Sequence, residues 1–233
     1  MKKYLYIALC CLFTACDNTE NEELLESVFF GTSQEVLSQN SYTSMTPVAG
    51  IYSQEFSSQS SSKEWTMGNN EHGTFGIEND HYFIQAKGSF NQWMNFSVNE
   101  TRDFQVEVSM SCNFLVGGTS LGIVFGASKD LKSYGSFMFS SEVPFFIGYY
   151  NGEKWEEWYS KSTAPYNETG YRNATHLYTI RKVGYKLHFF IDKKYLYSTD
   201  YSINLNNVGF TLSRGGVIMV DYIHVDYIET VKE

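Results

Sequence analysis

The sequence predicts an all-β fold, built as an antiparallel sandwich of two sheets. Apolar and polar residues alternate without a break over residues 103–112, which is the pattern of a strand with one buried face. Similar short runs recur roughly every 8–12 residues with turn signals between them, as in sandwiches. Between residues 50 and 230 no apolar stripe of helical period is longer than two turns.

The predicted strands follow one another in a single block. They lie at 73–77, 81–86, 92–98, 103–112, 120–127, 134–140, 145–150, 154–159, 176–183, 187–192, 207–213 and 217–228. In the last run, strict alternation gives two sets expected on opposite faces: Val220, Tyr222 and His224 against Asp221, Ile223 and Val225. No fixed-period repeat and no Pro/Gly linker divides the block, so we expect one domain at 47–233.

One dipeptide gives the strongest hairpin signal in the chain. Asn151-Gly152 separates two strand-like runs, and both residues tolerate the positive φ of a type I′ turn. We therefore expect a tight hairpin here.

Composition excludes two classes of protein. The 233 residues are 42% hydrophobic and 17% aromatic, which is ample apolar surface for a core, so a wholly disordered chain is excluded. The formal net charge of −9 leaves no basic excess to neutralise phosphates, so no nucleic-acid partner is expected.

The N-terminus has the pattern of a signal peptide. Lys2 and Lys3 precede an apolar run at 4–13, which is too short to span a bilayer. The run ends in Phe-Thr-Ala-Cys16, which resembles a bacterial lipobox. We expect a lipoprotein signal peptide at 1–15, with Cys16 lipidated and anchored in the membrane. The alternative is an ordinary secretory signal in which Cys16 is incidental.

Residues 16–46 are polar and read as a flexible tether. Its acidic start, at 17–23, resembles the surface-export signal of Bacteroidota lipoproteins. The expected location is therefore the outer membrane, with exposure on the cell surface as a further expectation. Beyond Cys16 the mature chain retains one cysteine, Cys112, so no intramolecular disulfide is expected; its position on an alternating strand favours a core role.

The order of features along the block supports a family resemblance. The segments in question are HYFIQAKG (81–88), GIVFGASKD (122–130), FFIGYYNGEKWEEW (145–158), LYTIRKVGYKLHFFID (177–192) and VIMVDYIHVDYI (217–228). Together they resemble a concanavalin A-like lectin/glucanase domain, the jelly-roll sandwich of legume lectins, laminin-G-like modules and several glycosidases. The family usually has an Asn-Gly turn in its late hairpin, where this chain has Asp192-Lys193-Lys194.

The resemblance also provides a test for catalysis. Retaining glycosidases of this fold carry Glu-x-Asp-x-x-Glu on one strand, with alternate residues sharing a face. Here Glu78-Asn79-Asp80 begins the motif, but Phe83 occupies its third position. Asp221 and Asp226 are five apart and are expected on opposite faces. A standard glycosidase is therefore not expected, although carboxylates within about 5–10 Å of one another on the concave sheet would support a non-standard one.

No cofactor is expected. The five histidines are scattered and do not have the paired spacing of a zinc site. Metal content stays open, including a structural calcium ion held by loop carbonyls and one carboxylate.

Aromatic and polar side chains gather around the expected hairpin and are the candidate ligand site. Aromatic rings pack on the C–H faces of sugars while polar side chains bond the hydroxyls. The candidates are Tyr149, Tyr150, Asn151, Trp155, Glu156 and Trp158. The alternative is that strand alternation buries part of the set, in particular Trp158, whose position matches a structural one in relatives.

The sequence thus predicts a surface- or periplasm-facing lipoprotein that binds carbohydrate or glycoconjugate without catalysis. Two alternatives stay open. One is a glycoside hydrolase-like enzyme of the same fold with a non-standard site, and the other is a protein-interaction module of the cell envelope.

Overall fold

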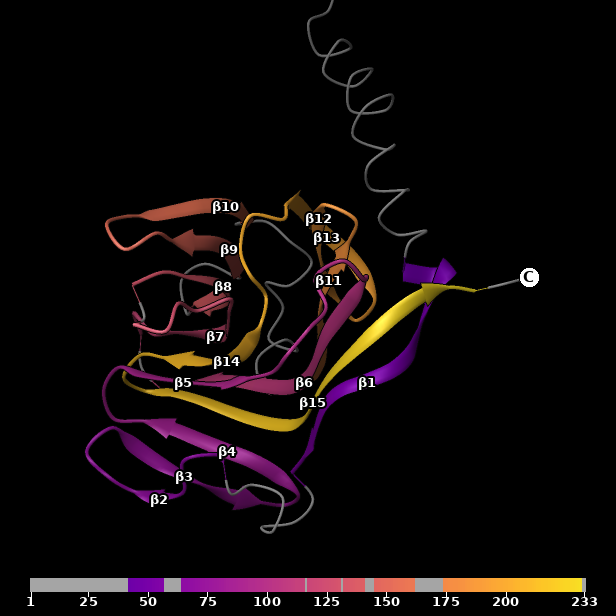
Figure 1. The fold of residues 1–233 in the computed structure, drawn as a ribbon. Helices are drawn as coiled ribbons and strands as arrows, with labels where there is room; N and C mark the ends of the chain where they lie inside the picture. Colours follow the sequence, from indigo (N-terminus) through magenta and orange to yellow (C-terminus); the bar gives the residue numbers. More distant parts are fainter. Residues whose placement is uncertain are drawn as a thin grey trace, which may run out of the picture. The chain divides into compact units, whose positions relative to one another are not determined.

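A computed structural model describes residues 42–56, 64–115, 117–130, 132–140, 145–161 and 174–231 (Figure 1). The predicted signal peptide, Cys16 and most of the tether lie outside these residues. The described part forms fifteen strands, β1 to β15, in two antiparallel sheets. The all-β, two-sheet prediction is therefore confirmed.

The larger sheet, sheet A, has nine strands. Eight of them follow the order β13-β12-β11-β6-β15-β4-β3-β2, and β1 also pairs with β15. Their bounds are β1 Met45–Glu55, β2 Gly68–Asn69, β3 Gly73–Glu78, β4 His81–Ala86, β6 Phe104–Phe114, β11 Thr175–Val183, β12 Lys186–Ile191, β13 Lys194–Asp200 and β15 Gly216–Thr230.

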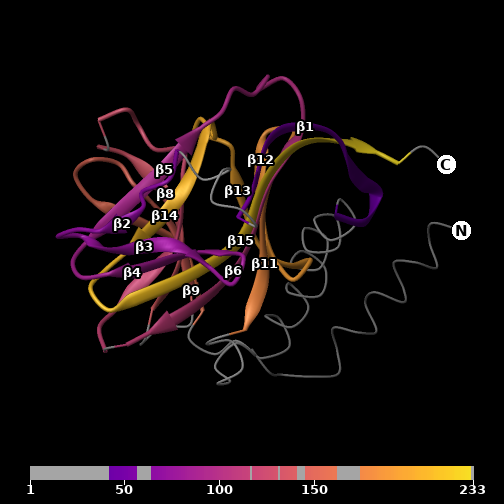
Figure 2. The same cartoon turned by 90° about the horizontal axis from the view of Figure 1, so that it is seen from below.

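The long strand β15 lies in the middle of sheet A. Along one side it pairs with β6; along the other, residues 217–220 pair with β4 and residues 222–230 pair with β1. Figures 1 and 2 show β1 and the second half of β15 bending together away from sheet B. The outer face of sheet A is the face that points away from sheet B. The bend makes this outer face concave.

The smaller sheet, sheet B, has six strands in the order β10-β9-β8-β7-β14-β5. Their bounds are β5 Phe90–Asn95, β7 Ser120–Phe125, β8 Tyr134–Ser140, β9 Phe145–Tyr150, β10 Trp155–Lys161 and β14 Asn207–Leu212.

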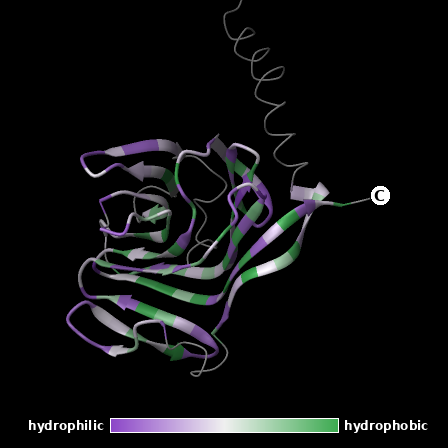
Figure 3. Ribbon diagram, viewed as in Figure 1, coloured by the Kyte–Doolittle hydropathy of each residue, from purple (hydrophilic) through white to green (hydrophobic). Residues whose placement is uncertain are grey.

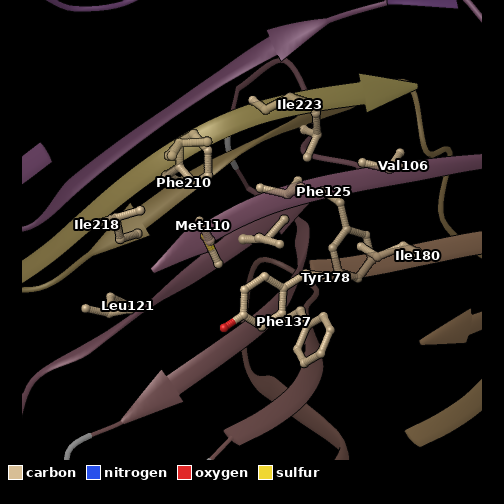
Figure 4. Packing of buried hydrophobic residues seen from close by; sticks show 14 of the residues in the cluster. Val106, Met110, Leu121, Phe125, Phe137, Tyr178, Ile180, Phe210, Ile218 and Ile223 are labelled. Atoms are coloured by element: carbon tan, nitrogen blue, oxygen red, sulfur yellow. The ribbon is translucent and has the colours of Figure 1, made fainter. Parts of the chain in front are cut away.

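The core lies between the two sheets. Strand β6 contributes Phe104, Val106, Val108, Met110 and Cys112, so the predicted alternation of this strand is confirmed. Figure 4 shows Val106, Met110 and Tyr178 meeting residues of sheet B, and Figure 3 shows hydrophobic and hydrophilic residues alternating along the strands. The side chain of Cys112 is buried and burial raises the pKa of its thiol, which confirms its core role.

The turns differ from the prediction in one place. The loop between β9 and β10 runs over residues 151–154, and within it only Gly152 has a positive φ, of 98°. The hairpin is therefore confirmed, but a two-residue type I′ turn at Asn151-Gly152 is wrong. Two-residue turns with both φ angles positive occur instead at Asn79-Asp80 and Asp192-Lys193. The first of these ends the partial glycosidase motif in a turn, away from any strand face.

Candidate functional site

A pair of stacked rings lies on the concave outer face of sheet A. The rings of Tyr222 and His224, both on β15, are 4.3 Å apart between centroids and 20° from parallel. Tyr222 donates a hydrogen bond from its hydroxyl to Glu107 Oε1 on β6, over 3.1 Å. His224 donates from Nε2 to Glu55 Oε1 on β1. The ring pair, Tyr222 and His224, is thus held between carboxylates from the two neighbouring strands.

Strict alternation did not predict this arrangement, because β15 contains a β-bulge. Its register with β6 shifts between Val220, which pairs with Met110, and Tyr222, which pairs with Ser109. The extra residue, Asp221, directs its side chain to the outer face, where it accepts a hydrogen bond of 3.3 Å from Ser109 Oγ.

Two expectations about β15 are therefore wrong. Val220 is buried in the core while Tyr222 and His224 lie on the outer face, and Asp221 shares that outer face with Asp226. The sequence feature that points to the ring pair is a Tyr and a His two residues apart on a predicted strand with carboxylates nearby. This feature does not reveal the bulge.

The outer face carries a concentration of negative charge. Burial raises the pKa of the Tyr222 hydroxyl, and the charges of Glu107, Asp221 and Glu55 raise it further, so the hydroxyl stays a neutral donor. Burial also raises the pKa of Asp226, against the lowering effect of His224. The ring pair stays partly accessible, because Tyr222 is partly exposed and the side chain of His224 is 31% exposed.

The arginine on the outer face of β11 is covered. Arg181 of β11 is buried and donates from Nε to Gln105 Oε1 over 2.9 Å. It also donates from Nη1 to the carbonyl oxygen of Tyr42 over 3.1 Å, and its guanidinium carbon lies 3.9 Å from the centroid of the Tyr42 ring. A ligand on this face therefore meets rings, carboxylates and hydroxyls before it meets a positive charge.

The hairpin candidates divide between two faces of sheet B. Tyr149 and Trp158 stack on each other at 6.0 Å and 16° and pack against the core. Tyr150 pairs with Trp155 across the strands, and the indole of Trp155 lies over Gly148, which has no side chain. The candidates predicted from the sequence therefore do not form one flat surface. All four rings are partly exposed, but Tyr149 and Trp158 pack against the core.

The polar hairpin candidates bond to each other and to the turn. Asn151 Oδ1 accepts from the backbone N–H groups of Glu153, over 3.1 Å, and Lys154, over 3.0 Å. Asn151 Nδ2 donates to Glu156 Oε1 over 2.9 Å. These bonds fix the loop conformation that presents Tyr150 and Trp155. A role for the hairpin in ligand binding stays a prediction.

The described residues contain neither a cluster of metal ligands nor a membrane-spanning helix. No group of three or more His, Cys, Asp or Glu side chains there is arranged to hold a metal ion. No helix in the same part of the chain is long and apolar enough to cross a membrane.

Solved structures with the same architecture identify the class of fold. A protein of unknown function with a galectin-like fold from Bacillus subtilis matches with a TM-score of 0.57 and 12% identity, covering 80% of this chain and 100% of that one. The catalytic domain of an endo-1,3-β-glucanase (laminarinase) from Thermotoga petrophila matches with a TM-score of 0.55 and 9% identity, covering 80% and 100%. The Bacillus licheniformis β-glucanase matches at 0.51 and 10%, covering 77% and 99%.

No family model matches the chain. No curated protein matches it either. At these low identities the structural likeness concerns the fold alone. The fold is that of the concanavalin A-like jelly-roll sandwiches, as the sequence resemblance predicted.

Proposed function

We propose that this protein binds carbohydrate without catalysis, on the concave outer face of sheet A. One observation carries the proposal, namely the accessible ring pair held between Glu107 and Glu55. Aromatic rings offer an apolar surface to the C–H face of a sugar, and carboxylates accept hydrogen bonds from its hydroxyls. The bend of β1 and β15 lets a ligand on the ring pair also contact the neighbouring strands.

The hydrogen bonds of the two glutamates favour binding over hydrolysis. A glycosidase needs one carboxyl group to protonate the leaving oxygen and a second to attack or to activate water. Glu107 accepts from Tyr222, and Glu55 accepts from His224, so each carboxylate also positions a ring of the site.

Hydrolysis is the second candidate function, and Asp226 is the observation that favours it. Burial raises the pKa of this carboxyl group, which is the direction required of a general acid, and it lies two residues from His224 on the same face. A hydrolase would use Asp226 as the acid and Glu107, on the adjacent strand, as its partner.

The proposal includes a lipid anchor at Cys16 and a location at the outer membrane, with exposure on the cell surface. The charged start, short apolar run and Phe-Thr-Ala-Cys16 sequence support it. Palmitate labelling of cells that express the wild type or Cys16→Ser tests the anchor; labelling that persists in the variant would contradict it.

The test of the binding proposal is a glycan array probed with purified protein, followed by calorimetry on the best ligand. We expect Tyr222→Ala to abolish binding and Trp155→Ala to leave it unchanged. Loss of binding in Trp155→Ala alone would move the site to the hairpin, and an array with no ligand would overturn the proposal. Release of new reducing ends by the wild type but not by Asp226→Asn would establish hydrolysis instead.

A further inference from the structure

We infer that the ring pair selects saccharides that carry a free, protonated amine over neutral N-acetylated and acidic ones. The inference rests on the proposed carbohydrate-binding function and names the ligand class of the same site. The site itself depends on the rings of Tyr222 and His224, and the charges around them decide which sugars bind best.

The accessible charges around the ring pair are negative on each strand that borders it. Strand β1 contributes Glu55, β6 contributes Glu107, and β15 contributes Asp221 and Asp226. The fields of Glu107, Asp221 and Glu55 all reach the Tyr222 hydroxyl. A cation placed against the Tyr222 ring is therefore attracted by three carboxylates as well as by the ring face.

The arginine of the neighbouring strand β11 is not accessible to a ligand, although its charge interacts with that of Glu107. Arg181 on β11 is buried under Tyr42 and bonded to Gln105, so it is not available to a carboxylate or sulfate of a ligand. His224 is bonded through Nε2 to Glu55, so this nitrogen is not available to a ligand. An acidic sugar would thus meet carboxylates on three strands without direct contact with the Arg181 guanidinium, which is unfavourable.

An amine also satisfies the hydrogen-bonding chemistry of the site better than an acetamide does. Glu107 has one oxygen, Oε1, bonded to Tyr222, so its carboxylate retains lone pairs toward the open face. An ammonium group has three donors for such acceptors, whereas an acetamide has a single N–H and a bulky acetyl group. Charge-assisted bonds of this kind are about twice as strong as neutral ones.

Calorimetry with ligands matched in length and linkage tests the inference. The probes are the β-1,4-linked glucosamine trimer, its fully N-acetylated counterpart and a galacturonic acid trimer, at a pH where the amine is protonated. We expect the amine trimer to bind about tenfold or more tighter than the N-acetylated one, with no detectable binding of the acidic trimer. Added salt should weaken binding of the amine trimer selectively.

Conservative variants assign the preference to the carboxylates. Glu107→Gln keeps an acceptor for Tyr222, and Glu55→Gln changes an exposed side chain, so both variants should fold. Each should weaken binding of the amine trimer several-fold more than it weakens binding of the N-acetylated trimer, so the preference for the amine should fall. Glu78→Gln, exposed at the end of β3, is the matched control and should not alter it.

Several outcomes would overturn the inference, and they are separable from failure of the proposed function. Equal or tighter binding of the N-acetylated or acidic trimer would overturn the amine preference but leave carbohydrate binding intact. Trilysine binding as tightly as the amine trimer would mean a general site for basic groups. A preference that survives both Gln variants would show that the carboxylates do not cause it. If no saccharide on the array binds, both proposals fail.

Discussion

The hydroxyl of Tyr222 donates a 3.1 Å hydrogen bond to Glu107 Oε1 and so connects β15 to β6 on the outer face of sheet A. The bond orients the carboxylate beside the ring that a sugar would cover. Replacing the hydroxyl therefore tests the site without removing the ring.

Tyr222→Phe should weaken glycan binding about threefold to tenfold, the effect of losing one such hydrogen bond. Stability should fall by only about 1 kcal/mol, because water can solvate the partly exposed Glu107. Calorimetry and urea unfolding measure the two effects. Tyr185→Phe, whose residue is 90% exposed on the turn between β11 and β12, is the control and should change neither. Unchanged glycan affinity in Tyr222→Phe would remove the hydroxyl from the site.

Gly148→Ala should destabilise the β9–β10 hairpin. A Cβ at this position would stand 2.4 Å from the Trp155 indole and 2.5 Å from the carbonyl oxygen of Glu156. We expect a loss of about 1–3 kcal/mol in the free energy of unfolding, with a shift in tryptophan emission. At Gly76, in contrast, an added Cβ meets nothing within 4 Å, so Gly76→Ala should be neutral or slightly stabilising. Equal stability of the two variants would contradict the close packing of Trp155 on Gly148.

Lys182 should be needed for stability although it is charged. Its side chain is 6% exposed, and Nζ donates to the carbonyl oxygens of Glu100, over 2.8 Å, and Arg102, over 3.1 Å. Lys182→Met leaves both acceptors without this donor and should cost about 2 kcal/mol or more. The matched variant Lys186→Met breaks an exposed contact with Asp200 and should stay within about 0.5 kcal/mol of wild type at neutral pH. Equal unfolding midpoints for Lys182→Met and Lys186→Met would show that the buried lysine contributes no more to stability than the exposed one.

His188 should make the protein less stable in mild acid. Burial, followed by the charges of Lys186 and Arg181, lowers the pKa of this histidine from 6.5 to about 4. Below pH 6.5 the unfolded chain therefore binds a proton that the folded protein takes up only near pH 4. The free energy of unfolding is therefore highest above pH 6.5 and falls as the pH drops from 6.5 to about 4, by up to about 3 kcal/mol.

Comparison of wild type with a His188 variant separates the contribution of His188 to the acid-induced loss of stability from that of the carboxylates. Urea unfolding of wild type and His188→Gln across this pH range should show a smaller loss in the variant, since all other groups titrate alike in both proteins. Parallel curves would mean that His188 does not contribute.

The sequence could predict most of the fold, because each strand of a sandwich has one buried face and the alternation shows it locally. Strand β6 is the clearest case, and Cys112 was correctly placed in the core. The partners of β15 could not be predicted, since pairing with β1 and β6 joins residues more than a hundred positions apart.

The candidate site was harder to predict than the fold. One extra residue at Asp221 changes which side chains of β15 share a face, and bulges have no reliable sequence signature. In the hairpin, the sequence located the rings but not their division between the core and the outer surface. Both errors concern the direction of side chains, which depends on register.

The central position of β15 sets the order in which the domain can fold. It follows all the other described strands in the chain, yet it joins the β6 side of sheet A to the β4 side and also pairs with β1. Its pairing of Thr230 with Met45 closes a loop of nearly the whole domain, and closures of such length slow folding. During synthesis, sheet A therefore stays incomplete until the C-terminal segment is available.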